Sequence, residues 1–150
     1  MIKYETSTTI EQPASAVFEV LLDAARWEQW TDMTEVTLDA AGRPGLGSRG
    51  SFRFPGGPFK GLVDTEIVEF EPGRRIVFRC THPALTWIAY AETRPDGDRT
   101  LFVYGGEMTI HGWRRLLEPM LRSEVEKGEA AEAQRLKALL EAEAPIAVPA

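Results

Sequence analysis

The sequence predicts an α+β fold in which a curved antiparallel sheet of six to seven strands wraps around one long C-terminal helix. Three observations support this. Polar and apolar residues alternate with a period of two over much of residues 35–110. Short turns rich in Pro and Gly separate these segments. From residue 113 onward the apolar period returns to 3.6. An amphipathic helix of that length cannot bury its apolar stripe alone, so it must pack on the sheet.

The first 30 residues predict one strand and two short helices. Residues 2–10 alternate and are rich in Thr, Tyr and Ile. Pro13 suits the first turn of a helix, and an apolar helical stripe follows at Val17, Phe18, Leu21 and Leu22. Residues 23–30 predict the second helix. Its Trp27 and Trp30 share one face, and we interpret them as core anchors.

The remaining elements follow from the same periods. Further strands are expected at 36–38, 51–54, 62–70, 75–81, 86–93 and 100–110. Residues 113–143 consist mainly of strong helix formers, and Pro119 should start or kink that helix. Its packing stripe is predicted at Leu117, Met120, Leu121, Ala131, Leu136, Leu139 and Leu140. We expect residues 144–150 to form a frayed tail.

Length and charge limit the function classes. The 150 residues predict one domain spanning 1–150. With 17 Lys and Arg against 23 Asp and Glu, the net charge of −6 argues against nucleic acid or an anionic membrane as partner. Residues 1–10 do not resemble a signal peptide, and no apolar run is long enough to span a membrane. We therefore expect a cytoplasmic monomer or homodimer.

Neither a metal nor a cofactor is expected. His82 and His111 are the only histidines, and nothing positions a third ligand beside them. Residues 45–50 match the G-x-G-x-x-G pattern, but a strand follows them where a dinucleotide site requires a helix. The single Cys80 excludes an internal disulfide and is interpreted as a small buried apolar residue.

The last two strands carry the residues expected to form a pocket. If the turn at 95–97 pairs Thr93 with Thr100, one face combines small residues with large rings, and such a face leaves unfilled volume. Its members are Trp87, Ala89, Ala91, Phe102, Tyr104, Gly106 and Met108.

The hairpin around Pro72 and Gly73 leaves two alternatives. With Phe70 opposite Arg75, the uncharged face is expected to point inward. That face comprises Val63, Thr65, Ile67, Ile76, Phe78 and Cys80. Glu66 and Arg79 then form a solvated cross-strand ion pair. Alternatively, Asp64, Glu66 and Arg79 point inward as a polar cluster capable of acid–base work.

Two further segments border the expected pocket. Phe59, in the glycine-rich loop 55–61, either caps the mouth or packs on the sheet. The run Glu124, Glu126, Lys127, Glu129 and Glu132 is interpreted as a solvated helix face. Gly128, which is unfavourable within a helix, makes room for either a ligand or a strand residue.

Four segments together resemble a known superfamily. They are Ile10-x-x-Pro13 with the Val17–Asp23 stripe, Trp27-x-x-Trp30, Glu69–Phe78 and Pro95–Thr100. In this order and spacing they resemble the START-like, Bet v 1-like superfamily (SRPBCC), specifically its polyketide cyclase/dehydratase-like group of small bacterial proteins. The resemblance implies a helix-grip fold with an internal cavity for hydrophobic small molecules. It does not imply one chemistry, because members include lipid carriers, hormone receptors, aromatase/cyclases and protein-binding modules.

The leading functional hypothesis is binding of a hydrophobic or aromatic molecule, such as a lipid or polyketide-like compound, between the sheet and the C-terminal helix. The expected ligand-binding residues are Phe59, Phe78, Trp87, Ala89, Ala91, Phe102, Tyr104, Gly106 and Met108. An alternative is a polyketide cyclase/dehydratase-type enzyme, in which Tyr104, Tyr90 or Glu107 moves a proton next to a carbonyl. A protein-interaction module is the third possibility.

Overall fold

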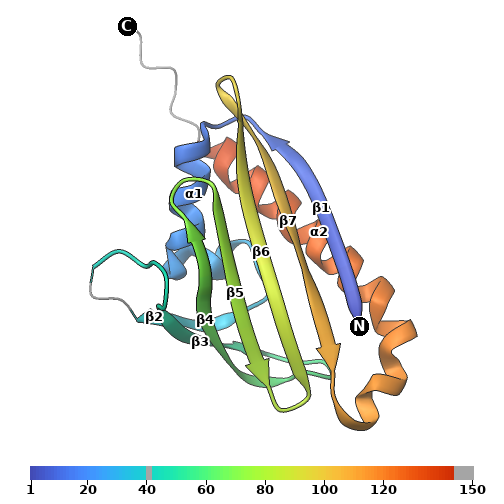
Figure 1. The fold of residues 1–150 in the computed structure, drawn as a ribbon. Helices are drawn as coiled ribbons and strands as arrows, with labels where there is room; N and C mark the ends of the chain where they lie inside the picture. Colours follow the sequence, from blue (N-terminus) through green and yellow to red (C-terminus); the bar gives the residue numbers. More distant parts are fainter. Residues whose placement is uncertain (40–41, 144–150) are drawn as a thin grey trace, which may run out of the picture.

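The computed structural model describes residues 1–39 and 42–143. Seven antiparallel strands form one open sheet in the order β1-β7-β6-β5-β4-β3-β2 (Figure 1). Their bounds are β1 Ile2–Ile10, β2 Thr34–Asp39, β3 Arg49–Phe54, β4 Gly61–Glu71, β5 Arg75–His82, β6 Leu85–Asp96 and β7 Arg99–Ile110. The predicted antiparallel meander is therefore confirmed, with β1 paired to β7. The prediction for the tail at 144–150 lies outside the described residues.

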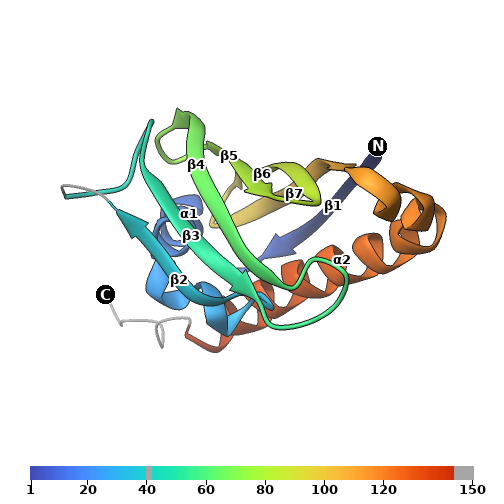
Figure 2. The same cartoon turned by 90° about the horizontal axis from the view of Figure 1, so that it is seen from below.

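The helices lie together on one side of the curved sheet (Figure 2). They are α1 Ala14–Leu22, the short 3₁₀ helix η1 Ala24–Gln29, a second 3₁₀ turn η2 Gly112–Leu117, and α2 Glu118–Ala142. Pro119 stands in the first turn of α2, where its missing N–H costs nothing. This proline starts the α-helix, and the segment before it winds as 3₁₀.

The helix α2 packs mainly along β1 and β7, near the β1 edge of that face. The rest of the same face is covered by α1 and η1, whose buried residues include Phe18, Leu21 and Trp27. The core therefore lies between the sheet and these two helical segments. Of the predicted α2 stripe, Leu121, Leu136 and Leu140 are buried.

Two residues predicted for the packing stripe of α2 do not belong to it. Met120 is 63% exposed, and Ala131 also faces solvent. The buried positions between Leu121 and Leu136 are instead Glu129, Glu132 and Ala133. The interpretation of Glu129 and Glu132 as part of a solvated face is therefore wrong as well.

The β6–β7 hairpin is tighter than predicted. Asp96 pairs with Arg99, and Thr93 pairs with Phe102 instead of Thr100. The difference is two residues, and because side chains alternate with a period of two, the inward face is unchanged. All seven residues predicted for that face are buried.

The β4–β5 hairpin contains a bulge that the turn alone could not predict. The register shifts between Ile67 and Glu69, so Phe70 pairs with Ile76 rather than Arg75. Beyond the bulge, the predicted pairing of Glu66 with Arg79 holds. The uncharged face points inward as expected, and Arg79 is exposed. Glu66 forms its ion pair with Arg49, at 3.1 Å, instead of Arg79. The alternative of an inward polar cluster on these strands is wrong.

Candidate functional site

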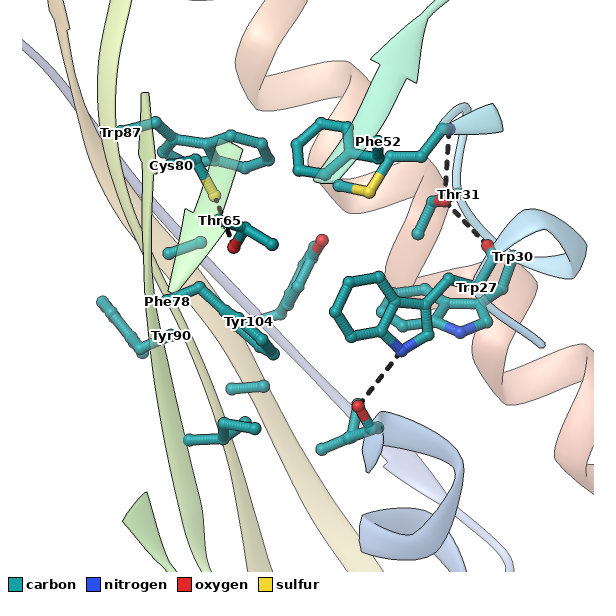
Figure 3. Close-up of a pocket in the computed structure, with 15 residues that line it drawn as sticks. Trp27, Trp30, Thr31, Phe52, Thr65, Phe78, Cys80, Trp87, Tyr90 and Tyr104 are labelled. Atoms are coloured by element: carbon teal, nitrogen blue, oxygen red, sulfur yellow. Dashed lines mark hydrogen bonds between the residues drawn. The ribbon is translucent and has the colours of Figure 1, made fainter. Parts of the chain in front are cut away.

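An apolar cavity of about 40 Å³ lies between the sheet and the α1–η1 segment (Figure 3). The sheet contributes residues of β3 to β7 to its walls, and α1, η1 and the chain after η1 contribute the rest. The lining consists of Leu21, Trp27, Trp30, Thr31, Met33, Phe52, Thr65, Ile76, Phe78, Cys80, Trp87, Ala89, Tyr90, Ala91 and Tyr104. The cavity was predicted beneath the C-terminal helix, but no residue of α2 belongs to this lining.

Five of the nine predicted ligand-binding residues line this cavity: Phe78, Trp87, Ala89, Ala91 and Tyr104. The two alanines of β6 leave space beside the rings, as their pattern predicted. The other four residues lie elsewhere for identifiable reasons.

Three of those four lie on the inward face of the sheet, but neighbouring side chains pack against them and separate them from the cavity. Phe102 is fully buried and stacks on Tyr104 with ring centroids 5.7 Å apart. Gly106 lies under the phenol of Tyr4, whose hydroxyl would be 2.7 Å from an added Cβ. Met108 is buried opposite Trp87, next to the end of the strand.

Phe59 does not cap the cavity. Its half-buried ring packs edge-on against His82, with centroids 6.2 Å apart, at the end of the sheet. Of the two alternatives for this residue, packing on the sheet is confirmed.

Two of the three predicted catalytic candidates point away from the interior. The hydroxyl of Tyr90 donates a hydrogen bond to Glu5 on the outer face, although its strand position borders the cavity. Glu107 is exposed and lies 3.5 Å from Lys3. Tyr104 alone directs its hydroxyl inward (Figure 3).

The two tryptophans of the η1 region serve both as core residues and as cavity walls. Trp27 meets Phe78 edge-to-face with centroids 5.2 Å apart, and Trp30 meets Tyr104 at 5.7 Å. The indole N–H of Trp27 donates to the carbonyl of Leu21, which fixes the ring against α1. Their interpretation as core anchors is confirmed, and it understates their contact with the cavity.

Behind Tyr104 lies a polar layer that sequence reasoning missed. The Tyr104 hydroxyl donates to Oε2 of Glu132 at 2.9 Å. On the neighbouring strand, the Trp87 indole donates to the Tyr4 hydroxyl at 2.8 Å. Oε2 of Glu129, one turn before Glu132 on α2, is buried and has no hydrogen-bond partner. Two carboxyl groups are therefore held in the interior beside two tyrosines.

Burial governs the ionisation of this layer. It raises the pKa of Glu132 to about 7 and that of Glu129 well above its usual range, and the proximity of the two carboxyl groups adds to the rise for Glu129. The Tyr104 hydroxyl acts in the opposite direction, because its hydrogen bond favours the charged carboxylate. Burial and the nearby carboxyl groups also raise the pKa of Tyr104 and Tyr4. This arrangement can hold or exchange a proton near neutral pH.

A spacing signal could have revealed the two glutamates. Leu121, Glu129, Glu132, Leu136 and Leu140 are separated by steps of eight, three, four and four residues, which keeps them on one helical face. Glu129 and Glu132 thus occupy positions where apolar residues would complete the stripe. A stripe built only from apolar residue types passes over them.

No cluster of three potential metal ligands occurs among residues 1–39 and 42–143. Within the same residues, no helix is both long and apolar enough to cross a membrane.

A curved antiparallel sheet that grips a long C-terminal helix around an apolar cavity defines a START-like helix-grip protein. Residues 1–141 match the family model described as polyketide cyclase/dehydrase and lipid transport. The chain belongs to this family. A search of curated proteins gives no match.

Solved structures share the fold at low sequence identity. The aromatase/cyclase Zhui from Streptomyces sp. R1128 superposes with a TM-score of 0.80 at 17% identity, covering 99% of this chain and 98% of that one. A START superfamily protein from Mycobacterium smegmatis gives 0.79 at 14% identity, with 94% and 98% covered. Truncated norcoclaurine synthase from Thalictrum flavum gives 0.68 at 13% identity, with 92% of each chain covered.

Proposed function

We propose that this protein binds a small hydrophobic or aromatic molecule, lipid or polyketide-like, in the cavity between the sheet and the α1–η1 segment. The observation that carries the proposal is the composition of the walls, in which aromatic rings surround the two small residues Ala89 and Ala91. Walls of this kind bury apolar surface and leave volume for a ligand. The family description, which names polyketide cyclases and lipid transport, supports the same class of ligand.

Binding requires the cavity to expand. Its volume of about 40 Å³ accommodates a few water molecules, whereas pockets for drug-sized ligands measure roughly 300–1,000 Å³. The walls contributed by Trp27, Trp30 and Met33 belong to short, non-sheet segments. We expect these side chains to move outward while the sheet stays fixed.

Native mass spectrometry of freshly purified protein, beside a denatured control, tests for a co-purified ligand. A titration with fatty acids, sterols and aromatic polyketides, followed by tryptophan fluorescence, tests binding directly. The variant Ala91→Phe fills the cavity and should abolish binding. Ile88→Phe adds the same ring at an outward-facing position of β6 and should leave binding intact. Failure of every ligand class in both assays would refute the proposal.

A cyclase/dehydratase-type enzyme is the second candidate, favoured by the Tyr104–Glu132 hydrogen bond at the cavity wall. A carboxyl group whose pKa is about 7 suits proton transfer at neutral pH. Once a carbonyl substrate that turns over is identified, Tyr104→Phe and Glu132→Gln should each lower kcat by at least about tenfold. Unchanged kcat in both variants would exclude this assignment.

A further inference from the structure

The layer between α2 and strands β1 and β7 contains two buried carboxyl groups, and neither forms an ion pair among the described residues. Glu129 and Glu132 are only 7% and 6% exposed. Among the described residues, no ion pair joins either of them to Lys, Arg or His. Arg135 lies one turn further along α2, where its guanidinium bonds Asp32 at 3.0 Å.

One carboxyl oxygen of Glu129 lacks the hydrogen bond that burial normally requires. Its Oε2 is inaccessible and unpartnered, while Glu132 accepts from Tyr104. A buried carboxyl oxygen without a donor is costly, and most such groups in native proteins are satisfied. A donor supplied by a bound molecule would remove this cost.

The carboxyl pair, Glu129 and Glu132, adjoins the cavity through two shared residues. The ring of Tyr104 lines the cavity, and its hydroxyl bonds Glu132. The indole of Trp87 also lines the cavity, and its N–H bonds Tyr4 in the same polar layer. The polar layer therefore lies directly behind one wall of the apolar cavity, on the far side of Tyr104 and Trp87.

The cavity walls also favour a positive charge. Trp27, Trp30, Phe52, Trp87 and Tyr104 present aromatic rings around the space. The faces of such rings attract ammonium groups, and desolvation strengthens that attraction. An aromatic enclosure with carboxyl groups behind its Tyr104 wall complements a cation carried on an apolar body.

We propose that the ligand of this protein carries a protonated amine, which the Glu129 and Glu132 carboxylates bind while its apolar body occupies the aromatic cavity. The proposal rests on the binding function proposed above and names the chemical class of the ligand. The ammonium group would donate to Oε2 of Glu129 and to Glu132, displacing or sharing the Tyr104 hydroxyl.

Proton release should accompany this binding. The groups facing the carboxyl pair are Tyr4 on β1, Cys80 on β5, Tyr104 on β7, and Asp32 with Arg135 at the helix edge. Within the pair, Glu132 has a pKa of about 7, and burial raises the pKa of Glu129 well above its usual range. Since the pKa of Glu132 is about 7, affinity for an amine should rise from about pH 6 to about pH 8, where the amine stays protonated.

Three probes of similar shape test the proposal: 2-phenylethylamine, 2-phenylethanol and 3-phenylpropanoate. Binding is followed at millimolar concentration by NMR shifts of the four tryptophan indole N–H groups. The amine should bind at least about tenfold more tightly than the alcohol, and the acid most weakly, since hydrogen bonds to charged groups are the strong ones. Only the amine affinity should rise with pH.

Variants localise the effect. Glu129→Gln and Glu132→Gln should each reduce the amine-to-alcohol preference by about tenfold. Glu126→Gln makes the same substitution on the exposed face of α2 and should leave the amine-to-alcohol preference unchanged. Equal affinity for amine and alcohol would overturn the amine assignment and leave the proposed binding function standing. Preference for the amine that survives both glutamine variants would also overturn it.

Discussion

The Tyr104 hydroxyl on β7 donates a hydrogen bond of 2.9 Å to Glu132 on α2, and both side chains are buried. This contact links the sheet to the long helix directly behind the Tyr104 wall of the cavity. It joins a residue that the sequence pattern identified to one that the pattern missed. The energetics of the site follow from it, because the hydroxyl stabilises the charged form of a carboxyl group in an apolar interior.

Tyr104→Phe should therefore raise the pKa of Glu132 above its value of about 7, because the variant removes the donor that favours the carboxylate. The cost in unfolding free energy should be about 1.5–3 kcal/mol near pH 8, where the acceptor is charged, and about 1 kcal/mol near pH 5. Carbon-13 NMR titration of the glutamate carboxyl groups measures the first effect, and urea unfolding at both pH values measures the second. An unchanged pKa would mean that the bond is not formed in solution.

Stability should fall as the pH rises from about 5 to about 8. The folded protein holds a proton on Glu132 up to about pH 7, whereas an unfolded glutamate loses it near 4.5. Between these values the native state binds more protons, so the unfolding free energy decreases with pH, by on the order of 3 kcal/mol. Glu129 acts in the same direction. Thermal unfolding across this pH range measures the slope.

Glutamine variants provide the controls for that slope. Glu129→Gln and Glu132→Gln should each flatten the pH dependence, and Glu126→Gln on the exposed face should not. A melting temperature that rises over this range in the parent protein would contradict the burial of the carboxyl pair.

Periodicity predicted the fold well because each strand has one face in the core. All seven strands and the inward face of β6 and β7 follow from alternation, and a two-residue slip in the Thr93 register does not change the face. The bulge at Val68 could not be predicted, since it depends on how β4 bends over the core.

The site was only partly predictable, for a different reason. Hydrophobic patterning identifies apolar walls such as Trp87 and Tyr104, but it assigns charged residues to the surface. Glu129 and Glu132 are buried because the tertiary structure places the Tyr104 hydroxyl and an apolar sheet face against that turn of α2. Similarly, the contribution of η1 to the cavity depends on how the chain folds back over the sheet.

Two glycines should respond in opposite ways to alanine. An added Cβ at Gly106 would lie 2.5 Å from the carbonyl oxygen of Ile88 and 2.7 Å from the Tyr4 hydroxyl. Gly106→Ala must therefore displace backbone or break the Trp87–Tyr4 bond, at a cost of about 1–3 kcal/mol. Urea unfolding measures the loss, and a neutral result would contradict the packing of Tyr4 over β7.

Gly128→Ala should stabilise the protein. A Cβ at this position of α2 meets no atom within 4 Å, so no strand residue requires the glycine here. Alanine in a helix interior gains about 1 kcal/mol over glycine. The expected outcome is a higher urea midpoint at unchanged slope. Loss of stability would show that the backbone of α2 departs from regular helix at this turn.

Cys80 should be almost inert in the folded protein. It is 3% exposed, and burial raises the pKa of its thiol to about 12, although Thr65 forms a 3.4 Å hydrogen bond with its sulfur. Reaction requires both thiolate and access, and access requires opening of the cavity that Cys80 lines. We expect labelling by iodoacetamide at pH 8 to be at least about a thousandfold slower than in denaturant. A bound ligand should slow it further, because it occupies the same space. Rapid labelling of the native protein would show that the cavity opens far more often than its packed walls indicate.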